Sequence, residues 1–243
     1  MYFWRDAAGP VDLAFTDRYG GVSAAPYDEL NLALDSDDDL AARTENHRIV
    51  LEDFGPGDEL VDLRQVHGAR IDVPEDPSGP RSPDGRPEAD GVVTARAGLT
   101  LMVRAADCVP VLLADAEQGV IAAVHSGRPG MVAAVAPAAV RRMRDLGAIR
   151  ITAWIGPHVC GRCYEVPEQM RDDVTAVVPA ARATTSWGTP ALDIGAGVRA
   201  QLEDEGCRVR DVSACTRETT ALYSHRRDGA GAGRLAGLIR RRP

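Results

Sequence analysis

The stretch 99–125, LTLMVRAADCVPVLLADAEQGVIAAVH, decides the fold class because it contains three short apolar runs in close succession. Runs of this length, bounded by polar and turn-forming residues, are typical of strands that are buried on both faces. They cover Leu99–Arg104, Val109–Ala114 and Val120–His125. An acid and a thiol, Asp107 and Cys108, lie between the first two runs. A carboxylate is rarely buried without a partner, so this pair calls for a partner elsewhere in the chain.

Helical and extended patterns alternate on either side of this stretch, but without a strict strand–helix–strand repeat. The opening segment predicts strands joined by tight loops, and 59–73 predicts two strands that turn near Gly68. The segment 74–87, with five Pro and two Gly, predicts a loop. Further strands are expected within 149–156, 207–216 and 233–241, and helices within 38–54, 130–147, 167–178 and 193–206. The sequence therefore predicts a mixed α/β or α+β fold, with 1–243 forming a single domain.

Composition excludes several function classes. A net charge of −8 argues against nucleic acid as a partner, because phosphate backbones are bound by basic surfaces. No run of 18 apolar residues and no secretory signal pattern are present, so we expect a cytoplasmic protein that does not enter membranes. All 28 basic residues are Arg, which excludes lysine Schiff bases and P-loop lysines. Five Cys without an export signal favour reduced thiols.

Three metal-binding side chains stand at predicted strand ends: His67 in QVHG, Cys108 in AADCVP and His125 in AVHSG. Two imidazoles and a thiolate could hold Zn²⁺ with its fourth position open, which is the arrangement of a catalytic zinc site. Asp107 would then orient a ligand or act as an acid–base group. However, the spacings of 41 and 17 residues match no local zinc signature. From the residues alone, a buried thiol and hydrogen-bonded histidines are therefore the favoured interpretation.

Two further motifs favour structural readings. CGRC, Cys160–Cys163, fits C-x-x-C, but a zinc ribbon needs a second pair, and Cys207 and Cys215 are spaced poorly for one. Two thiols in a turn are therefore favoured. GAGVRA, 195–200, fits the dinucleotide-binding pattern formally, but no strand–helix–strand unit surrounds it, so helix-packing glycines are favoured.

In a chain without Lys, anions must be bound by Arg, His or backbone amides. The segment SHRRDGAGAG places Arg226 beside a glycine-rich loop, and ENHR places Arg48 on a predicted helix. Both are candidates for binding phosphate or a carboxylate. A solvated charged surface is the alternative for each.

Taken in order, the motifs resemble the YfiH/YlmD-like family, also called the laccase-domain or polyphenol oxidase family. The resemblance is carried by RYGGVSAAPYDELNLAL, ENHR, RQVHGARI, EADGVVT, AADCVPVLLAD, AAVHSGRPG, WIGPHVCGRCYEV and ACTRETTALYSHRRDGAGAGRLAGLI. It implies a four-layer α/β/β/α fold with mixed sheets and a zinc ion bound by His67, Cys108 and His125. Copper is expected as a possible substitute for zinc.

The same resemblance implies a purine nucleoside enzyme acting as a monomer on small molecules. The reactions are phosphorolysis of adenosine, inosine, guanosine or methylthioadenosine, and deamination of adenosine. Cys108 and His125 would be catalytic together with Asp107, which would shuttle the proton in deamination. Arg48 and Arg226 are expected to bind phosphate, and Asn31 the nucleoside.

Two alternatives stay open: an amidase that edits a peptidoglycan precursor with Cys108 as nucleophile, and a metal-binding protein without enzymatic activity. A multicopper laccase mechanism is rejected, because four coppers need many imidazoles and the chain has five His. The sequence departs from the family pattern at HSGRPG, where Arg128 and Pro129 replace Trp and Arg, and at Ala106, which replaces Thr. These departures affect the expected substrate preference and phosphorolysis more than the metal ligands.

Overall fold

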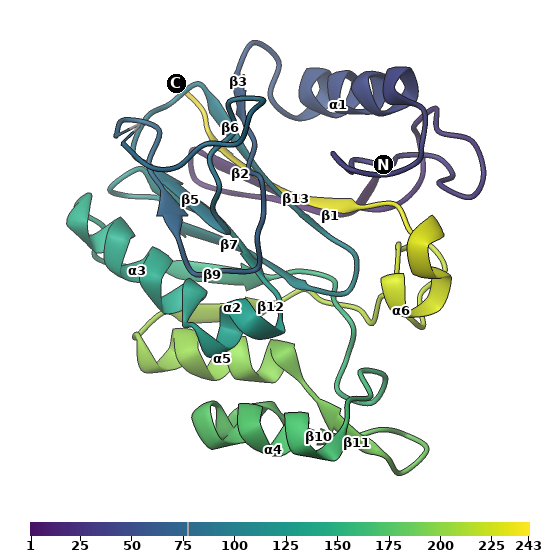
Figure 1. The fold of residues 1–243 in the computed structure, drawn as a ribbon. Coiled ribbons are helices and arrows are strands. Elements are labelled where there is room, and N and C mark those ends of the chain that lie inside the picture. Colours follow the sequence, from purple (N-terminus) through teal and green to yellow (C-terminus); the bar gives the residue numbers. More distant parts are fainter. Residues whose placement is uncertain (77) are drawn as a thin grey trace.

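Two β-sheets packed face to face form the centre of the computed structural model, which describes residues 1–76 and 78–243 (Figure 1). The first sheet has the order β1 (Tyr2–Ala8), β2 (Val11–Thr16), β13 (Leu235–Arg241), β6 (Leu99–Ala105) and β3 (Glu59–Val61). The second has the order β12 (Arg208–Asp211), β9 (Thr152–Ile155), β7 (Val109–Asp115), β8 (Val120–Ser126), β5 (Gly91–Thr94) and β4 (Ile71–Asp72). Both sheets contain parallel and antiparallel pairs.

Helices cover the outer faces of both sheets and complete four layers, α/β/β/α (Figure 1). Helix α1 (Leu40–Phe54) packs on the first sheet, and α3 (Val135–Asp145) and α5 (Ile194–Asp204) pack on the second. The remaining elements are α2 (Arg128–Val132), α4 (Glu168–Val177), α6 (His225–Asp228), the short β10–β11 ribbon (Arg182–Thr184 and Pro190–Leu192), and single 3₁₀ turns at Pro179–Ala181 and Gly229–Gly231. The predicted mixed fold and its four layers are confirmed.

Alternating side chains divide the strands between three apolar layers. In β7, Leu112 and Ala114 face the first sheet, whereas Val111 and Leu113 face α3 and α5. Successive side chains of a strand point to opposite faces, so a strand sandwiched between two layers must be apolar on both. All seven residues of β6, of β7 and of β8 are buried, which explains the continuous apolar runs and confirms the three predicted strands.

Two sequence predictions are wrong. The expected strand pair around Gly68 does not form, because β3 pairs with β6 in the first sheet and β4 pairs with β5 in the second. The intervening segment instead crosses between the sheets. The expected single helix after Pro129 is broken into α2 and α3 at Ala134, whose φ of 58° is left-handed.

The remaining helix predictions agree with the structure within about two residues at their N-terminal ends, and the C-terminal strand is present as β13. The glycines of GAGVRA lie in α5 and allow close packing, since a Cβ at Gly195 would overlap the His158 ring. The proline-rich segment 74–87 has turns and isolated bridges in its described residues, and Pro77 lies outside the described residues.

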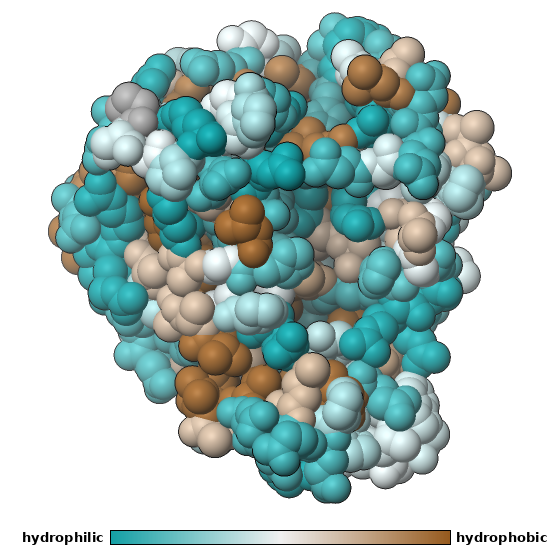
Figure 2. Space-filling view, in the orientation of Figure 1, coloured by the Kyte–Doolittle hydropathy of each residue, from teal (hydrophilic) through white to brown (hydrophobic). Residues whose placement is uncertain are grey.

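On the face shown in Figure 2, hydrophilic side chains predominate and the hydrophobic ones form separate small patches. Within the described part of the chain, no helix has the length and apolar character needed to cross a membrane.

Candidate metal centre

Three donor side chains meet where β7 begins and β8 ends. Cys108 directly precedes β7, and the antiparallel register places His125 of β8 opposite Pro110. His67, from the segment that crosses between the sheets, completes the group. The donor atoms of His67, Cys108 and His125 all lie within 4.8 Å of one another. The structure thus brings together the three residues whose spacing along the chain gave no local signature.

The two imidazoles and the thiol face one common point. Cys108 Sγ lies 3.8 Å from His67 Nε2, and the two histidine rings meet edge to face with centroids 4.8 Å apart. His125 is buried, Cys108 is half-buried and His67 is exposed. One side of the group is therefore open toward solvent, as a site that must admit a substrate requires.

Asp90, which sequence reasoning missed, holds both histidines in place. Its carboxylate accepts hydrogen bonds from the backbone N–H groups of Val66, His67 and Gly68 at 3.2, 2.9 and 2.6 Å. It also contacts His125 Nδ1 at 2.8 Å and is fully buried. A carboxylate on Nδ1 fixes the proton there and leaves Nε2 free to bind a metal. The signal in the sequence was EADGVVT, where an acid directly precedes a buried strand.

The charged forms of Cys108 and His125 stabilise each other. Burial alone would raise the pKa of Cys108, but the neighbouring His125 and His67 lower it to about 6. Burial would lower the pKa of His125, but the Cys108 thiolate and Asp90 raise it to about 9. The site thus favours a thiolate, which is the form of cysteine that binds metals and attacks electrophiles.

Backbone strain is concentrated at the same place. His67 and Asp107 have φ values of 60° and 91°, in the left-handed region that residues with a Cβ rarely occupy. Among the described non-glycine residues, only Ala134 shares this property. Such conformations cost on the order of 1–3 kcal/mol each and persist where the surrounding contacts hold them.

Because Gly127 has no side chain, the donor side chains of His67 and Cys108 can occupy the space beside it. A Cβ at this position would lie 2.8 Å from His67 Cδ2 and 3.1 Å from Cys108 Sγ. Both distances are shorter than ordinary carbon contacts, so any side chain here would push the two donors away from each other.

Substitution of Gly127 with alanine is therefore expected to weaken metal binding about 10-fold while the chain stays folded, since a displaced ligand loses part of its coordination energy. Metal titration followed by calorimetry measures the affinity, and circular dichroism checks the fold. Unchanged affinity in the folded variant would show that Gly127 does not control the spacing of the donors.

The group of His67, Cys108 and His125 lies in a cleft of about 580 Å³ that is rich in arginine. The cleft is lined by the three donors and by Ala33, Leu34, Asp35, Arg64, Gln65, Val66, Arg104, Ala105, Ala106, Asp107, Tyr164, His225, Arg226 and Arg234. Arg104 is paired with Asp62, and Arg64 lies 3.8 Å from Asp35. Across the described residues, Arg226 and Arg234 form no ion pair with a carboxylate. These two guanidinium groups are free to bind an anion.

Arg226 is held by other contacts that leave its charge uncompensated. Its guanidinium lies over the Tyr164 ring, 4.4 Å from the centroid, and donates to the Glu165 carbonyl at 2.9 Å. Arg234 donates to the carbonyls of Ala232 and Gly233 at 2.7 and 3.0 Å. Arg226 thus lies in the cleft, and its expected contact with phosphate stays a prediction.

Asp107 lines the cleft, but both of its carboxylate oxygens are occupied. One accepts from the Thr216 hydroxyl and the other from the Arg226 backbone N–H, each at 2.6 Å. These contacts supply the partner that a buried acid requires. They also tie the strand end that carries Cys108 to the segment that carries Arg226.

Arg48 and Asn31 do not line the cleft, contrary to the expected substrate contacts. Arg48 is on the exposed side of α1 and pairs with Glu45 and Glu52, so the intrahelical charges satisfy it. Asn31 is fully buried, and its side-chain oxygen accepts from the backbone N–H groups of Ala33 and Arg234, each at 3.0 Å. Asn31 therefore supports the cleft wall from behind.

Gln65 is another cleft residue that sequence reasoning missed. It exchanges two hydrogen bonds with the backbone of Arg104, each of 2.7 Å, and so joins the His67 segment to β6. The sequence feature that could have identified Gln65 is its position in RQVHG, two residues before His67.

Known proteins are similar to this chain in sequence and in fold. Residues 12–242 match the family model described as multi-copper polyphenol oxidoreductase laccase. The chain is 54% identical over 239 residues to a purine nucleoside phosphorylase of Streptomyces coelicolor, with 97% of each chain covered.

Solved structures of two other proteins have the same fold as this chain. The Neisseria meningitidis protein NMB0706 has a TM-score of 0.85 and 28% identity, with 100% of this chain and 99% of that one covered. YfiH of Bacillus licheniformis has a TM-score of 0.84 and 28% identity, with 95% and 92% covered. The resemblance inferred from the motifs is confirmed: the chain belongs to the laccase-like family of multi-copper polyphenol oxidoreductases, which includes YfiH.

Proposed function

We propose that this protein is a zinc-dependent purine nucleoside phosphorylase that acts on adenosine, inosine, guanosine or methylthioadenosine, with 1–243 as one catalytic domain. The observation that carries the proposal is the position of the uncompensated Arg226 and Arg234 in the same cleft as the His67–Cys108–His125 group. The name of the Streptomyces relative, a purine nucleoside phosphorylase at 54% identity, supports purine nucleosides as the class of substrate.

The donor set fits a single zinc ion. Two imidazoles and one thiolate with an open side suit Zn²⁺, and they would also accept copper as a substitute. The group has too few imidazoles for the copper cluster of a laccase. When bound, the ion supplies a Lewis acid that can polarise a phosphate oxygen or activate water.

In phosphorolysis, a phosphate oxygen forms a bond to C1′ of the ribose while the bond between C1′ and the purine nitrogen breaks. The electron pair of that bond stays with the purine, which takes up a proton, and ribose 1-phosphate is the second product. Arg226 and Arg234 bind the phosphate dianion and hold it beside the sugar. Asp107 fixes the backbone of Arg226 and so positions this anion site relative to Cys108.

Deamination of adenosine belongs to the same proposal, with water taking the place of phosphate. The purine ring then accepts the attack at C6, and ammonia leaves after protonation. Asp107 remains the candidate for moving this proton, which requires exchange of its hydrogen bond to Thr216 or to Arg226.

Incubation of the protein with each nucleoside, with and without phosphate, tests the proposal. We expect free base and ribose 1-phosphate only when phosphate is present, and inosine from adenosine when it is absent. Chromatography of the products distinguishes the two reactions. No free base with a fully zinc-loaded protein would contradict the phosphorolysis.

Replacement of Arg226 by alanine is expected to raise the KM for phosphate about 10- to 100-fold, because a charge-assisted hydrogen bond contributes about 1.5–3 kcal/mol. The backbone N–H that contacts Asp107 is retained in this variant, so the metal group keeps its support. Arg48→Ala, which removes a similar charge from the surface of α1, is the matched control and should leave this KM unchanged. Equal effects of both substitutions would indicate general electrostatics instead of a phosphate contact.

The amidase remains a second candidate because of one observation. Asp90, His125 and Cys108 form a carboxylate–imidazole–thiol series, and the pKa of Cys108 is lowered to about 6 by the histidines, although burial opposes this. This arrangement suits a nucleophilic cysteine on a peptidoglycan precursor. Release of a free amino acid from a muramoyl peptide by metal-free protein would support it over the phosphorylase.

A further inference from the structure

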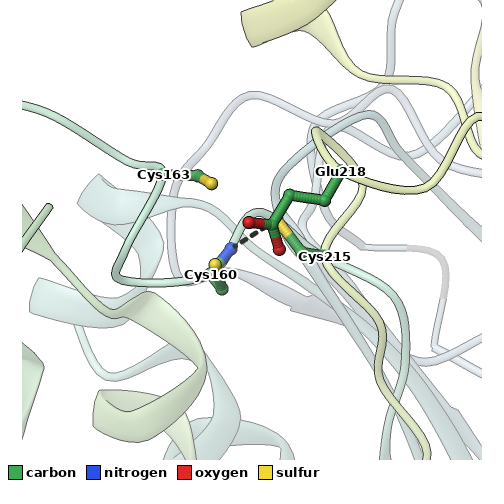
Figure 3. Close-up of side chains that lie close together, drawn as sticks. All are labelled: Cys160, Cys163, Cys215 and Glu218. Atoms are coloured by element: carbon green, nitrogen blue, oxygen red, sulfur yellow. Dashed lines mark hydrogen bonds between the residues drawn. The ribbon is translucent and has the colours of Figure 1, made fainter. Parts of the chain in front are cut away.

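A second group of metal-binding side chains lies outside the cleft, formed by Cys160, Cys163, Cys215 and Glu218 (Figure 3). Three thiols and one carboxylate offer donor atoms that all lie within 4.8 Å of one another. In the sequence alone, Cys207 and Cys215 are spaced poorly for the second pair of a zinc ribbon, so two thiols in a turn are favoured for Cys160 and Cys163. The fold instead brings Cys215 to the CGRC segment.

Both halves of the group have the same local construction. Cys160 and Cys163 are three residues apart in a turn, where the N–H of Cys163 donates to the Cys160 carbonyl at 2.9 Å. Cys215 and Glu218 are also three residues apart, and the N–H of Glu218 donates to the Cys215 carbonyl at 3.2 Å. Paired ligands with this spacing, contributed by two separate turns, are typical of tetrahedral structural zinc sites.

The two turns are already joined by the backbone. His158 N–H donates to the Ala214 carbonyl at 3.2 Å, and Thr216 N–H donates to the His158 carbonyl at 3.0 Å. The N–H of Cys160 also points at Cys215 Sγ, 3.5 Å away (Figure 3). This contact is a further link between the two turns and places the two sulfur-bearing segments side by side.

We propose that Cys160, Cys163, Cys215 and Glu218 bind a second Zn²⁺ ion, which links the two turns and has a structural role. Four protein ligands close the coordination sphere, in contrast to the open group in the cleft. Thiolates select soft or borderline ions over Mg²⁺ and Ca²⁺. The Arg162 guanidinium, 3.8 Å from the Glu218 carboxylate, offsets part of the excess negative charge.

The position of this site explains what it would stabilise. Val159, next to Cys160, donates its N–H to the Asp107 carbonyl at 3.1 Å, and Thr216, next to Cys215, donates to the Asp107 carboxylate. A zinc ion that joins Cys160 to Cys215 would therefore hold both segments that support Asp107. The proposal does not depend on the activity of the cleft.

The zinc content of the full-length protein, purified without chelator and under reducing conditions, tests the proposal. Elemental analysis and native mass spectrometry should find two zinc ions per chain in the wild type. Cys163→Ser and Cys215→Ser should each lower the count by one, whereas Cys207→Ser, which removes a buried thiol outside the group, should not. We expect Tm to fall by about 5 °C or more on loss of this ion, since a ligand of the folded state stabilises it.

Two further measurements keep the result clear if a cysteine variant fails to fold. Glu218→Gln changes an exposed residue and should speed zinc release to a chromogenic chelator without unfolding the chain. Cobalt substitution should give thiolate charge-transfer absorption that persists in His67→Ala, where the cleft ion is lost. A zinc count that Cys163→Ser and Cys215→Ser leave unchanged from the wild type, or a Cys160–Cys163 disulfide in freshly alkylated protein, would overturn the proposal. Loss of the cleft ion alone would leave it intact and count against the proposed function instead.

Discussion

Replacement of Cys108 with serine is expected to remove the metal ion from the cleft and to lower kcat/KM for phosphorolysis about 1000-fold or more. The thiolate is the only anionic donor among His67, Cys108 and His125, so its loss removes most of the charge that holds a dication. A Lewis acid at a reacting centre contributes several kcal/mol, and about 4 kcal/mol corresponds to a factor of about 1000. Zinc analysis and steady-state kinetics with inosine and phosphate measure the two effects.

Cys207→Ser is the matched control, because Cys207 is a buried thiol packed in the layer between the second sheet and its helices. It should keep both zinc and activity. Full zinc content in Cys108→Ser would remove the cysteine from the ligand set. Full zinc content together with loss of amino-acid release from a muramoyl peptide would identify Cys108 as a nucleophile and favour the amidase.

Replacement of Asp90 with asparagine is expected to weaken metal binding about 10- to 100-fold, the usual effect of losing a carboxylate that orients a metal-binding histidine. It should also lower the free energy of unfolding by about 2–4 kcal/mol, since an amide cannot accept all of the N–H groups that Asp90 accepts. The His67 segment and His125 depend on this one carboxylate, so both donors should move. Metal titration and urea unfolding check the two parts.

Asp115 provides an unusually close control. It is buried, and its carboxylate accepts from the backbone N–H groups of Glu117, Gln118, Ile149 and Arg150. It lies at the other end of β7 from Cys108. Asp115→Asn should therefore destabilise the fold to a similar degree and leave metal affinity unchanged. Equal losses of metal affinity in both variants would show that Asp90 acts through stability alone.

The sequence predicted the central strands well because their surroundings constrain both faces. The strands β7 and β8 lie between two apolar layers, so the run of apolar residues is continuous and easily recognised. The predicted strand pair around Gly68 was wrong because the alternation of apolar and polar residues in this segment is typical of any half-buried extended chain. Which sheet such a chain joins depends on partners far along the sequence, here β5 and β6.

Cys108 and His125 could be recognised as candidate ligands because they lie at the ends of recognisable strands, but their metal-binding role was implied by the family resemblance and not by their spacing. Asp90 could not be recognised in this way, because its role depends on backbone N–H groups more than 20 residues earlier that meet it only in the folded chain. The absence of Lys showed that anions must be bound by Arg, His or backbone amides, but it did not show which of these groups lie in the site. Arg48 and Arg226 look alike in sequence, and only the fold shows that Arg48 is paired with acids and Arg226 is not.

The place of β13 in the first sheet sets an order of assembly during protein synthesis. This strand, near the C-terminal end of the chain, pairs with β2 on one side and with β6 on the other, so the first sheet is incomplete until Arg241 has left the ribosome. His67, Asp90, Cys108 and His125 emerge long before then, whereas Arg234 directly precedes β13. The nascent chain therefore exposes the three candidate metal ligands before it exposes Arg234, and the cleft cannot be complete until the segment that carries Arg234 and β13 has been synthesised.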